Sequence, residues 1–282
     1  MTIHKVGVIG AGLMGSGIAQ TCAQSGYETI VREINQPLLD KGIKRIHDAW
    51  DTMVSKGKLT SEQVAANRAR LHETLNLEDF ADCDLVIEVI LENMEEKIRL
   101  FTALDHLLKP GAFILSNTSS LNVTQMGAVT KRADKVCGLH FFNPAPVMKL
   151  VEIVKTISTS EETIAEIQQF AKSLGKTPVL AKDTAGFIVN FLLIPYLIAA
   201  IRMLENGMAS RDDIDTAMKL GCGYPMGPFT LLDYVGLDTT LWAAEAIYEE
   251  YKDPLYAPPP LLRRMVLSGM TGRKSGRGFY EY

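Results

Sequence analysis

The stretch that decides the fold is "KVGVIGAGLMGSGIAQTCAQSGYETIVRE", residues 5–33. It opens with a short apolar run (5–10), continues with apolar residues at helical spacing (15–26) and closes with a second β-rich run (27–33). Three glycines between the first run and the helical segment follow the pattern G-x-G-x-x-G. The stretch therefore predicts a strand, a glycine-rich turn, a helix and a second strand in succession.

The glycine-rich turn "GAGLMG" (10–15) has the full context of a dinucleotide-binding motif. The first glycine permits the tight turn, the second lets the backbone approach a pyrophosphate at the helix N-terminus, and the third allows close helix–strand packing. Glu33 ends the second strand, where a carboxylate accepts hydrogen bonds from ribose hydroxyls and repels a 2′-phosphate, which favours NAD. A glycine turn that binds nothing is the alternative. The residues expected to contact NAD here are Gly10, Gly12, Leu13, Met14, Gly15 and Glu33.

The alternation of strand and helix continues beyond this unit. Helical patterns at 37–56 and 93–108 are interleaved with β-rich runs, which predicts a Rossmann-type α/β fold with a doubly wound, mainly parallel sheet. From about Thr184 long helical patterns replace the alternation. A boundary near 181–186 then gives an NAD-binding domain (1–183) and an all-α C-terminal domain (184–282). The further strands expected are 83–90, 112–117, 135–141 and 150–156.

The most apolar segment is "FIVNFLLIPYLIAAI", residues 187–201. It is short for a bilayer and is interrupted by Asn190 and Pro195, so we expect a buried helix and no membrane association. This helix should end near Gly207, and Ser210 with Asp213 reads as the capping start of the next helix. A helical domain this apolar is expected to bury surface against a second copy in a homodimer, with its own core as the alternative.

Composition excludes several classes of function. A net charge of −4 over 282 residues gives no basic excess for nucleic-acid binding. The four cysteines form no CxxC pair and no signal peptide is recognisable, so we expect free thiols in a cytoplasmic protein. The five histidines are scattered, so no metal site is expected.

The segment "GLHFFNPAPVMKLVEIV" (138–154) carries a candidate acid–base pair. His140 lies where a strand should end, at the carboxyl edge of the sheet, where such folds bind ligands. Histidine suits proton transfer because its ordinary pKa lies near neutral pH. Glu152, on the next strand, can fix the imidazole tautomer and stabilise imidazolium. A core histidine with a carboxylate nearby is the alternative that these residues leave open.

Six motifs, in order along nearly the whole chain, resemble those of the L-3-hydroxyacyl-CoA dehydrogenases, and most closely the short bacterial 3-hydroxybutyryl-CoA dehydrogenases. The motifs are "GAGLMGSGIAQ", "SNTSSL", "GLHFFNPAPVMKLVEIV", "GFIVN", "AMKLGCGYPMGPFTLLDYVGLD" and "GRKSGRGFYEY". The resemblance implies a dimeric enzyme that interconverts an (S)-3-hydroxyacyl-CoA and a 3-ketoacyl-CoA with NAD. The implied acyl-CoA pair is 3-hydroxybutyryl-CoA and acetoacetyl-CoA, with a hydride passing to or from the nicotinamide and the proton to or from His140.

The resemblance also assigns roles to individual residues. It implies that His140, Glu152, Ser119 and Asn190 are catalytic. The implied contacts on the nicotinamide and ribose side of NAD are Glu92, Lys97, Ser119, Asn143 and Lys274. The implied contacts with the acyl-CoA substrate are Lys56, Ser119, Asn143 and Asn190. The sequence departs from the usual family pattern at Glu33, Ala185, Phe191 and Ala257.

Each assignment has a structural alternative. Ser119 can be a helix cap or turn residue, Asn190 a helix–helix hydrogen bond, and the lysines solvated charges. Two rival functions share the architecture: a β-hydroxyacid dehydrogenase that acts on a free acid with a catalytic lysine, and a non-catalytic dinucleotide-binding structural protein. The segment around His140 and the C-terminal motif argue against the first, and the presence of all four catalytic-type residues argues against the second.

Overall fold

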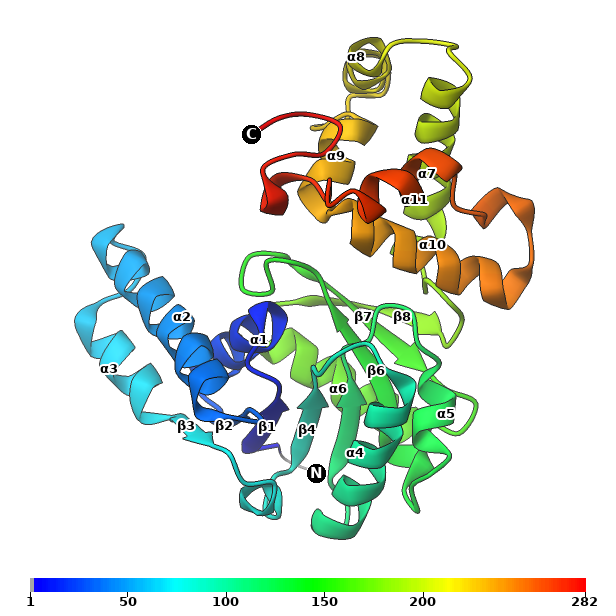
Figure 1. Cartoon of the computed structure of the whole chain (residues 1–282). Coiled ribbons are helices and arrows are strands. Elements are labelled where there is room, and N and C mark those ends of the chain that lie inside the picture. The colour runs from blue at the N-terminus through cyan, green and yellow to red at the C-terminus, as the bar shows by residue number, and fades with distance from the viewer. Residues whose placement is uncertain (1–2) are drawn as a thin grey trace. The chain divides into compact units, whose positions relative to one another are not determined.

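The computed structural model describes residues 3–282 (Figure 1). The chain divides into two compact units, one that ends at Asp183 and one that spans Thr184–Tyr282. Each unit has its own cluster of buried apolar side chains.

The described part of the first unit contains an eight-stranded sheet in the order β3-β2-β1-β4-β5-β6-β7-β8. Neighbouring strands run parallel, except that β6 and β7 are antiparallel. The strands are β1 (Lys5–Ile9), β2 (Glu28–Arg32), β3 (Leu71–Thr74), β4 (Leu85–Glu88), β5 (Phe113–Ser116), β6 (Val136–Phe141), β7 (Leu150–Lys155) and β8 (Thr177–Lys182). The predicted doubly wound, mainly parallel sheet is confirmed.

Two strands lie outside the sequence-based prediction, and both are edges of the sheet. β3 has the sequence "LHET" and β8 the sequence "TPVLAK", and most of their residues are partly or fully exposed. Central strands of a parallel sheet are covered on both faces and therefore read as apolar runs, whereas edge strands do not. The missing apolar run explains why these two strands escaped prediction.

Helices cover both faces of this sheet (Figure 1). Apolar side chains of α1, α2 and α6, such as Ile18, Ile46 and Ile167, share one buried cluster with Val8 and Ile87 of the sheet. The helices are α1 (Leu13–Gln24), α2 (Gln36–Ser55), α3 (Ser61–Ala69), α4 (Met94–Leu107), α5 (Val123–Gly127) and α6 (Glu161–Ser173). The strand order reverses between β1 and β4, so the crevice at their carboxyl ends is the expected ligand site of this topology.

The second unit is entirely helical in its regular structure. Its helices are α7 (Val189–Glu205), α8 (Arg211–Cys222), α9 (Pro228–Val235), α10 (Leu237–Tyr251) and α11 (Pro260–Leu267). The predicted capping start is confirmed, since the Ser210 side chain accepts a hydrogen bond from the backbone N–H of Asp213. Among residues 3–282, none of the helices combines the length and the apolar character that a membrane crossing requires.

Two buried aspartates bind the C-terminal segment into the second unit. The carboxylate of Asp233, 1% exposed, accepts hydrogen bonds from the backbone N–H groups of Phe279 and Tyr280, both at 2.8 Å. Asp215 accepts a third bond from the Tyr280 hydroxyl at 3.0 Å. A Cβ atom at Gly278 would lie 1.9 Å from an Asp233 oxygen, so only glycine fits there. The motif "GRKSGRGFYEY" therefore has a structural role in closing this unit.

Candidate active site

The three glycines of the first turn differ in what surrounds them. Gly10 has φ +104°, and a Cβ atom there would lie 2.4 Å from the carbonyl oxygen of Val89. A Cβ atom at Gly15 would lie 1.8 Å from the carbonyl oxygen of Gly10. At Gly12 it would meet no protein atom within 4 Å. The fold itself therefore requires glycine at positions 10 and 15, whereas the open space at Gly12 suits the close approach of a ligand.

The first turn of α1 is prepared for an anion. Gly12 is the N-cap residue of α1, and no side chain caps the helix. The backbone N–H groups of an uncapped first turn are unsatisfied, and with the helix dipole they attract a phosphate group. The chain thus fits the pyrophosphate of a dinucleotide at the place that the sequence predicts.

Two charged residues hold the glycine turn in shape. One Glu33 oxygen accepts a hydrogen bond from the backbone N–H of Ala11 at 2.8 Å, and the other accepts one from Ile34 at 3.0 Å. Arg45 of α2 donates to the carbonyl oxygen of Gly12 at 3.1 Å and to the Ser16 hydroxyl at 3.0 Å. Each carboxylate oxygen has two lone pairs, so Glu33 can fix the turn and still accept a ribose hydroxyl. Sequence reasoning missed Arg45, because nothing distinguishes it from the other charged residues of its helix.

A buried ion pair lies at the carboxyl end of β4. The Lys97 ammonium, 1% exposed, lies 2.5 Å from one oxygen of Glu88 and 3.2 Å from an oxygen of Glu92. The other Glu88 oxygen accepts a hydrogen bond from the Ser116 hydroxyl at 2.6 Å. Removing one partner of a buried pair typically costs about 3–5 kcal/mol, because the other charge stays buried without compensation. The solvated alternative for Lys97 is therefore wrong, and its direct contact with NAD stays a prediction.

This ion pair positions Glu92 against the turn after β5. Glu92 accepts hydrogen bonds from the Thr118 hydroxyl at 2.5 Å and from the backbone N–H of Ser119 at 2.9 Å. Sequence reasoning missed Glu88, although an acid within the apolar run "LVIEVI" was a usable signal, since a buried carboxylate needs a partner.

Neighbouring residues fill the cap and turn roles that are the structural alternatives for Ser119. The hydroxyl of Thr118 accepts hydrogen bonds from the backbone N–H groups of Ser120 and Leu121 and so forms the turn. Asn122 is the N-cap of α5, since its side chain accepts a hydrogen bond from Gln125. Cap and turn are thus supplied without the Ser119 hydroxyl, which is on a half-buried residue and suits a ligand.

His140 and Glu152 face each other across the antiparallel pair β6–β7. They are direct partners in the strand register, and His140 Nδ1 lies 2.7 Å from a Glu152 oxygen. The Glu152 side chain is fully buried and that of His140 is 8% exposed. Because a carboxylate only accepts hydrogen bonds, this bond places a proton on Nδ1, so that in the neutral imidazole the lone pair is on Nε2. The geometry favours an oriented base over a core histidine with an acid nearby.

The remaining candidates lie on a loop, at the end of a helix or in the second unit. Asn143 is exposed in the loop after β6, and Lys56 is an exposed C-cap residue of α2. In the second unit, Asn190 is half-buried in the first turn of α7. The Lys274 ammonium lies 2.6 Å from an Asp238 oxygen, so Lys274 is ion-paired and only partly solvated. In the first unit, Glu92, Ser119 and His140 thus lie at or just after the carboxyl ends of β4, β5 and β6. Glu152 lies opposite His140 near the start of β7, Lys97 reaches Glu92 from α4, and Lys56 stays on the end of α2.

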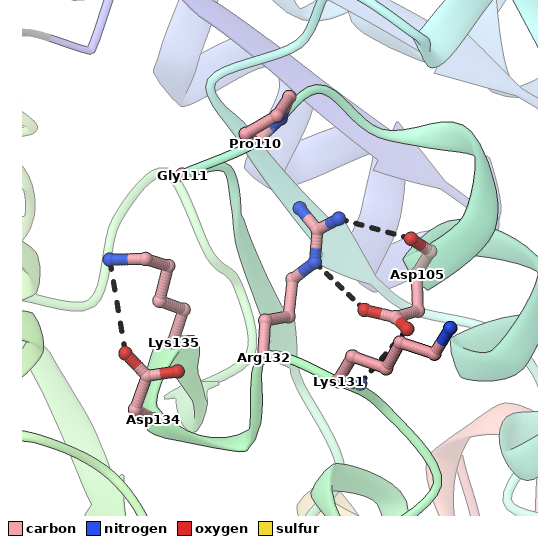
Figure 2. Close-up of a pocket in the computed structure, with 7 residues that line it drawn as sticks. All are labelled: Asp105, Pro110, Gly111, Lys131, Arg132, Asp134 and Lys135. Carbon is pink, nitrogen blue, oxygen red and sulfur yellow. Dashed lines mark hydrogen bonds and ion pairs between the residues drawn. The ribbon is translucent and has the colours of Figure 1, made fainter.

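A hollow of about 300 Å³ lies at the amino ends of β5 and β6, and its main contacts are structural (Figure 2). Arg132 lies in it beside Asp105, and its guanidinium makes a hydrogen bond with that carboxylate at 2.9 Å. It also donates to carbonyl oxygens of residues 105, 108, 109 and 112 at the C-terminal end of α4 and beyond. Arginine has five N–H groups, so none is left for a ligand. Burial raises the pKa of Asp105, but hydrogen bonds from Lys131 and Arg132 outweigh it and lower that pKa overall.

The comparisons with known proteins cover the whole chain. Residues 5–184 match the NAD-binding domain of 3-hydroxyacyl-CoA dehydrogenase, and residues 186–282 match its C-terminal domain. The chain belongs to the 3-hydroxyacyl-CoA dehydrogenase family. The turn at 10–15 and the cluster around His140 therefore lie in the family's NAD-binding domain, and NAD is the cofactor.

Several members of this family are similar to the chain over its full length. A 3-hydroxybutyryl-CoA dehydrogenase of Mycobacterium tuberculosis is 46% identical, with 99% of each chain covered. The human mitochondrial hydroxyacyl-coenzyme A dehydrogenase is 47% identical over 99% of this chain and 91% of its own length. The crystal structure of (S)-3-hydroxybutyryl-CoA dehydrogenase from Ralstonia eutropha is 42% identical, has a TM-score of 0.96, and covers 100% of this chain and 99% of its own.

The different surroundings of Gly12 and Gly15 give opposite predictions for alanine. Gly12→Ala should fold normally but place a methyl group in the ligand's space, and an overpacking cost of about 1–3 kcal/mol corresponds to roughly 5- to 150-fold weaker NADH binding. Gly15→Ala should lower the thermal unfolding temperature, because its methyl group clashes with the backbone. Fluorescence titration with NADH and thermal unfolding measure the two effects.

Gly221→Ala is the matched control, since that helical glycine also faces open space but lies in the second unit. It should leave NADH affinity unchanged and stability equal or slightly higher. NADH affinity unchanged in Gly12→Ala would contradict the pyrophosphate site.

Proposed function

We propose that the protein interconverts (S)-3-hydroxybutyryl-CoA and acetoacetyl-CoA with NAD(H), as a member of a family that acts on 3-hydroxyacyl-CoA substrates. The observation that carries the proposal is the pairing of His140 with Glu152 at 2.7 Å, at the carboxyl edge of the sheet in the NAD-binding domain. Relatives named 3-hydroxybutyryl-CoA dehydrogenase, 43–46% identical over nearly the whole chain, support the four-carbon substrate.

Oxidising a secondary alcohol removes a hydride from carbon and a proton from oxygen. NAD supplies the hydride acceptor when it is bound. His140 takes the hydroxyl proton on Nε2, because Nδ1 is already protonated and held by Glu152. Glu152 then stabilises the imidazolium, as the acid of a Ser-His-Asp triad does. In the reducing direction the imidazolium returns the proton to the ketone oxygen.

Other residues are proposed to bind the substrate and the cofactor. Ser119 supplies a hydroxyl to the substrate oxygen or the nicotinamide side, supported by the engagement of its backbone with Glu92. Asn143 and Asn190 supply amide groups to the substrate, and Lys274 contacts the nicotinamide side of NAD. Lys56 is proposed to meet a phosphate of CoA, which agrees with its exposure and with the absence of an ion pair to it among residues 3–282.

The second unit is proposed to serve the substrate and dimerisation, while the first unit binds NAD. Support for a homodimer comes from large apolar side chains on its surface, among them Leu220 at 81% exposed and Trp242 at 60%. Contiguous exposed apolar patches commonly mark protein interfaces, and these side chains are proposed to contribute to such a patch. We place the enzyme in the cytoplasm, in fatty acid and butyrate metabolism.

A substrate series tests the proposed function. NADH oxidation with 3-ketoacyl-CoA thioesters from C4 to C16 should give the highest kcat/KM at C4, and free acetoacetate should not be reduced. Reduction of acetoacetate but not of its thioester would instead favour the free-acid dehydrogenase, and no turnover with any of these substrates would favour the structural protein.

Lys56→Ala should raise KM for acetoacetyl-CoA several-fold at low salt with little change in kcat, because an exposed charge contributes modestly and is screened by salt.

The paired His140 and Glu152, here called the dyad, predict a large loss of rate without loss of the fold when either is replaced. His140→Gln should lower kcat for acetoacetyl-CoA by about 10²–10⁴, the usual contribution of general acid–base catalysis, while NADH binding persists. Glu152→Gln should also lower kcat strongly, because an amide can stabilise the wrong tautomer and carries no charge to support imidazolium.

The double variant separates a dyad from two independent residues. If the pair acts as one unit, His140→Gln combined with Glu152→Gln should be hardly slower than His140→Gln alone. Thermal unfolding of each variant controls for lost structure. Losses that simply multiply, or full activity in folded His140→Gln protein, would overturn the dyad.

Glu33 predicts the choice between the two nicotinamide cofactors. A carboxylate beside the ribose repels a 2′-phosphate, and like charges in contact cost several kcal/mol, so kcat/KM should favour NADH over NADPH by about 10²-fold or more. Arg32 precedes Glu33 and can soften this preference by pairing with a phosphate, because its bond to the Leu75 carbonyl at 3.1 Å uses only the Nε–H of its five N–H groups. Glu33→Gln removes the charge. It should lower the ratio of kcat/KM for NADH to that for NADPH, mainly by raising kcat/KM for NADPH. A wild-type preference for NADPH would show the assignment to be wrong.

A further inference from the structure

The loop that joins β6 to β7 (142–149) carries Asn143 and is poorly buried. Residues 143, 144 and 146–149 are exposed, and Ala145 alone is buried, at 2%. The loop makes two internal backbone hydrogen bonds, which the N–H groups of Val147 and Met148 donate to the carbonyl oxygen of Pro144. Exposed loops with so few bonds open easily, so something outside the loop must fix the position of Asn143.

Lys176 is the side chain that reaches this loop. Its ammonium donates to the carbonyl oxygen of Ala145 at 2.6 Å and to that of Met148 at 2.9 Å. Lys176 is 7% exposed, and burial lowers the pKa of its ammonium, an effect that the nearby Cys22 opposes. Hydrogen bonds from a charged donor in a buried setting are among the stronger ones in proteins.

The backbone of Lys176 is itself firmly held. It lies in the turn between α6 and β8, and its N–H donates to the carbonyl oxygen of Ala171 at 3.1 Å. The next residue, Thr177, donates to the carbonyl oxygen of Lys149 at 2.7 Å, where β8 begins to pair with β7. The ammonium therefore projects from a fixed point onto a loop that has little support of its own.

The other side of the loop rests on α1. A Cβ atom at Gly17 would lie 3.0 Å from Pro146 Cδ and 3.3 Å from Ala145 Cβ, so the loop packs closely on this helix. α1 is the helix whose N-terminus accepts the pyrophosphate. The loop is thus held between Lys176 and the helix that fixes the cofactor.

We propose that Lys176 is a positioning residue that clamps loop 142–149 onto α1 and so sets Asn143 relative to bound NAD and substrate. This inference rests on the proposed function for its kinetic consequence and on the contacts alone for the order of the loop. Lys176 is not a catalytic residue, because its ammonium contacts only backbone oxygens of the loop.

The test replaces Lys176 by methionine, which keeps the length of the side chain but removes the donor. Hydrogen exchange of the Val147 and Met148 amides should become about tenfold faster or more, as expected when a local opening loses its restraint. In acetoacetyl-CoA reduction, kcat/KM should fall about tenfold, and the loss should be non-additive with that of Asn143→Ala because both act on one group.

Lys109→Met is the matched control. The Lys109 ammonium lies 2.6 Å from an oxygen of the buried Asp84, at the amino ends of the strands. This variant therefore removes a lysine from a buried acceptor but leaves the loop untouched. It should lower the unfolding temperature without changing loop exchange or kcat/KM at 25 °C.

Gly17→Ala is the second variant, for use if Lys176→Met does not fold. Its methyl group presses on the loop from the side of α1 and should produce the same loss, coupled to Asn143, while favouring the helix itself. Unchanged loop exchange in folded Lys176→Met, or losses fully additive with Asn143→Ala in either variant, would overturn the clamp. If wild-type protein does not reduce acetoacetyl-CoA, the proposed function fails, and loop exchange together with NADH titration still tests the clamp.

Discussion

The site depends on the one antiparallel pairing in the described sheet. A parallel strand after β6 would need a long crossover, and its residues would arrive from elsewhere in the chain. Because β7 turns back along β6, residue 152 lies directly opposite residue 140. The imidazole therefore contacts the carboxylate with no other segment of the chain between them. The hairpin also places its loop next to α1, where Lys176 holds it. The same reversal therefore pairs His140 with Glu152 and brings Ala145 and Pro146 of the loop against α1.

The second constraint is the burial of charge beneath the site. Glu88 and Lys97 are both almost fully inaccessible and satisfy each other, and the remaining Glu88 oxygen is bound by Ser116. This arrangement gives Lys97 a fixed direction, so that it also holds Glu92 against the turn that contains Ser119. A buried ion pair is a poor source of stability but a good way to fix geometry. The proposed substrate and cofactor contacts thus rest on a rigid polar layer.

The glycine turn shows the same division between contact and support. Gly12 leaves space for the ligand, whereas Gly10 and Gly15 satisfy packing within the protein. Glu33 and Arg45 bind the turn from opposite sides through its N–H and carbonyl groups. Glu33 therefore holds the turn in addition to its proposed role in the choice of cofactor, so a variant at this position also changes the turn. Arg45 contacts the turn through the carbonyl oxygen of Gly12 and the hydroxyl of Ser16.

By itself, the sequence determined the central strands, the glycine turn, the capping start at Ser210 and the acid–base candidates, because apolar periodicity, glycine spacing and helix caps are local properties of the chain. It did not determine the edge strands β3 and β8, whose exposed residues lack an apolar run. Only the tertiary structure decided that residues 140 and 152 are register partners, that Thr118 and Asn122 supply the turn and cap, and that Lys97 is buried on Glu88. It likewise decided that Arg45 contacts the glycine turn and that Lys176 contacts the loop 142–149. Lys176 contacts backbone carbonyl oxygens, which every residue carries, and Arg45 contacts such oxygens together with the Ser16 hydroxyl, so no side-chain pattern could mark these contacts before the chain was folded.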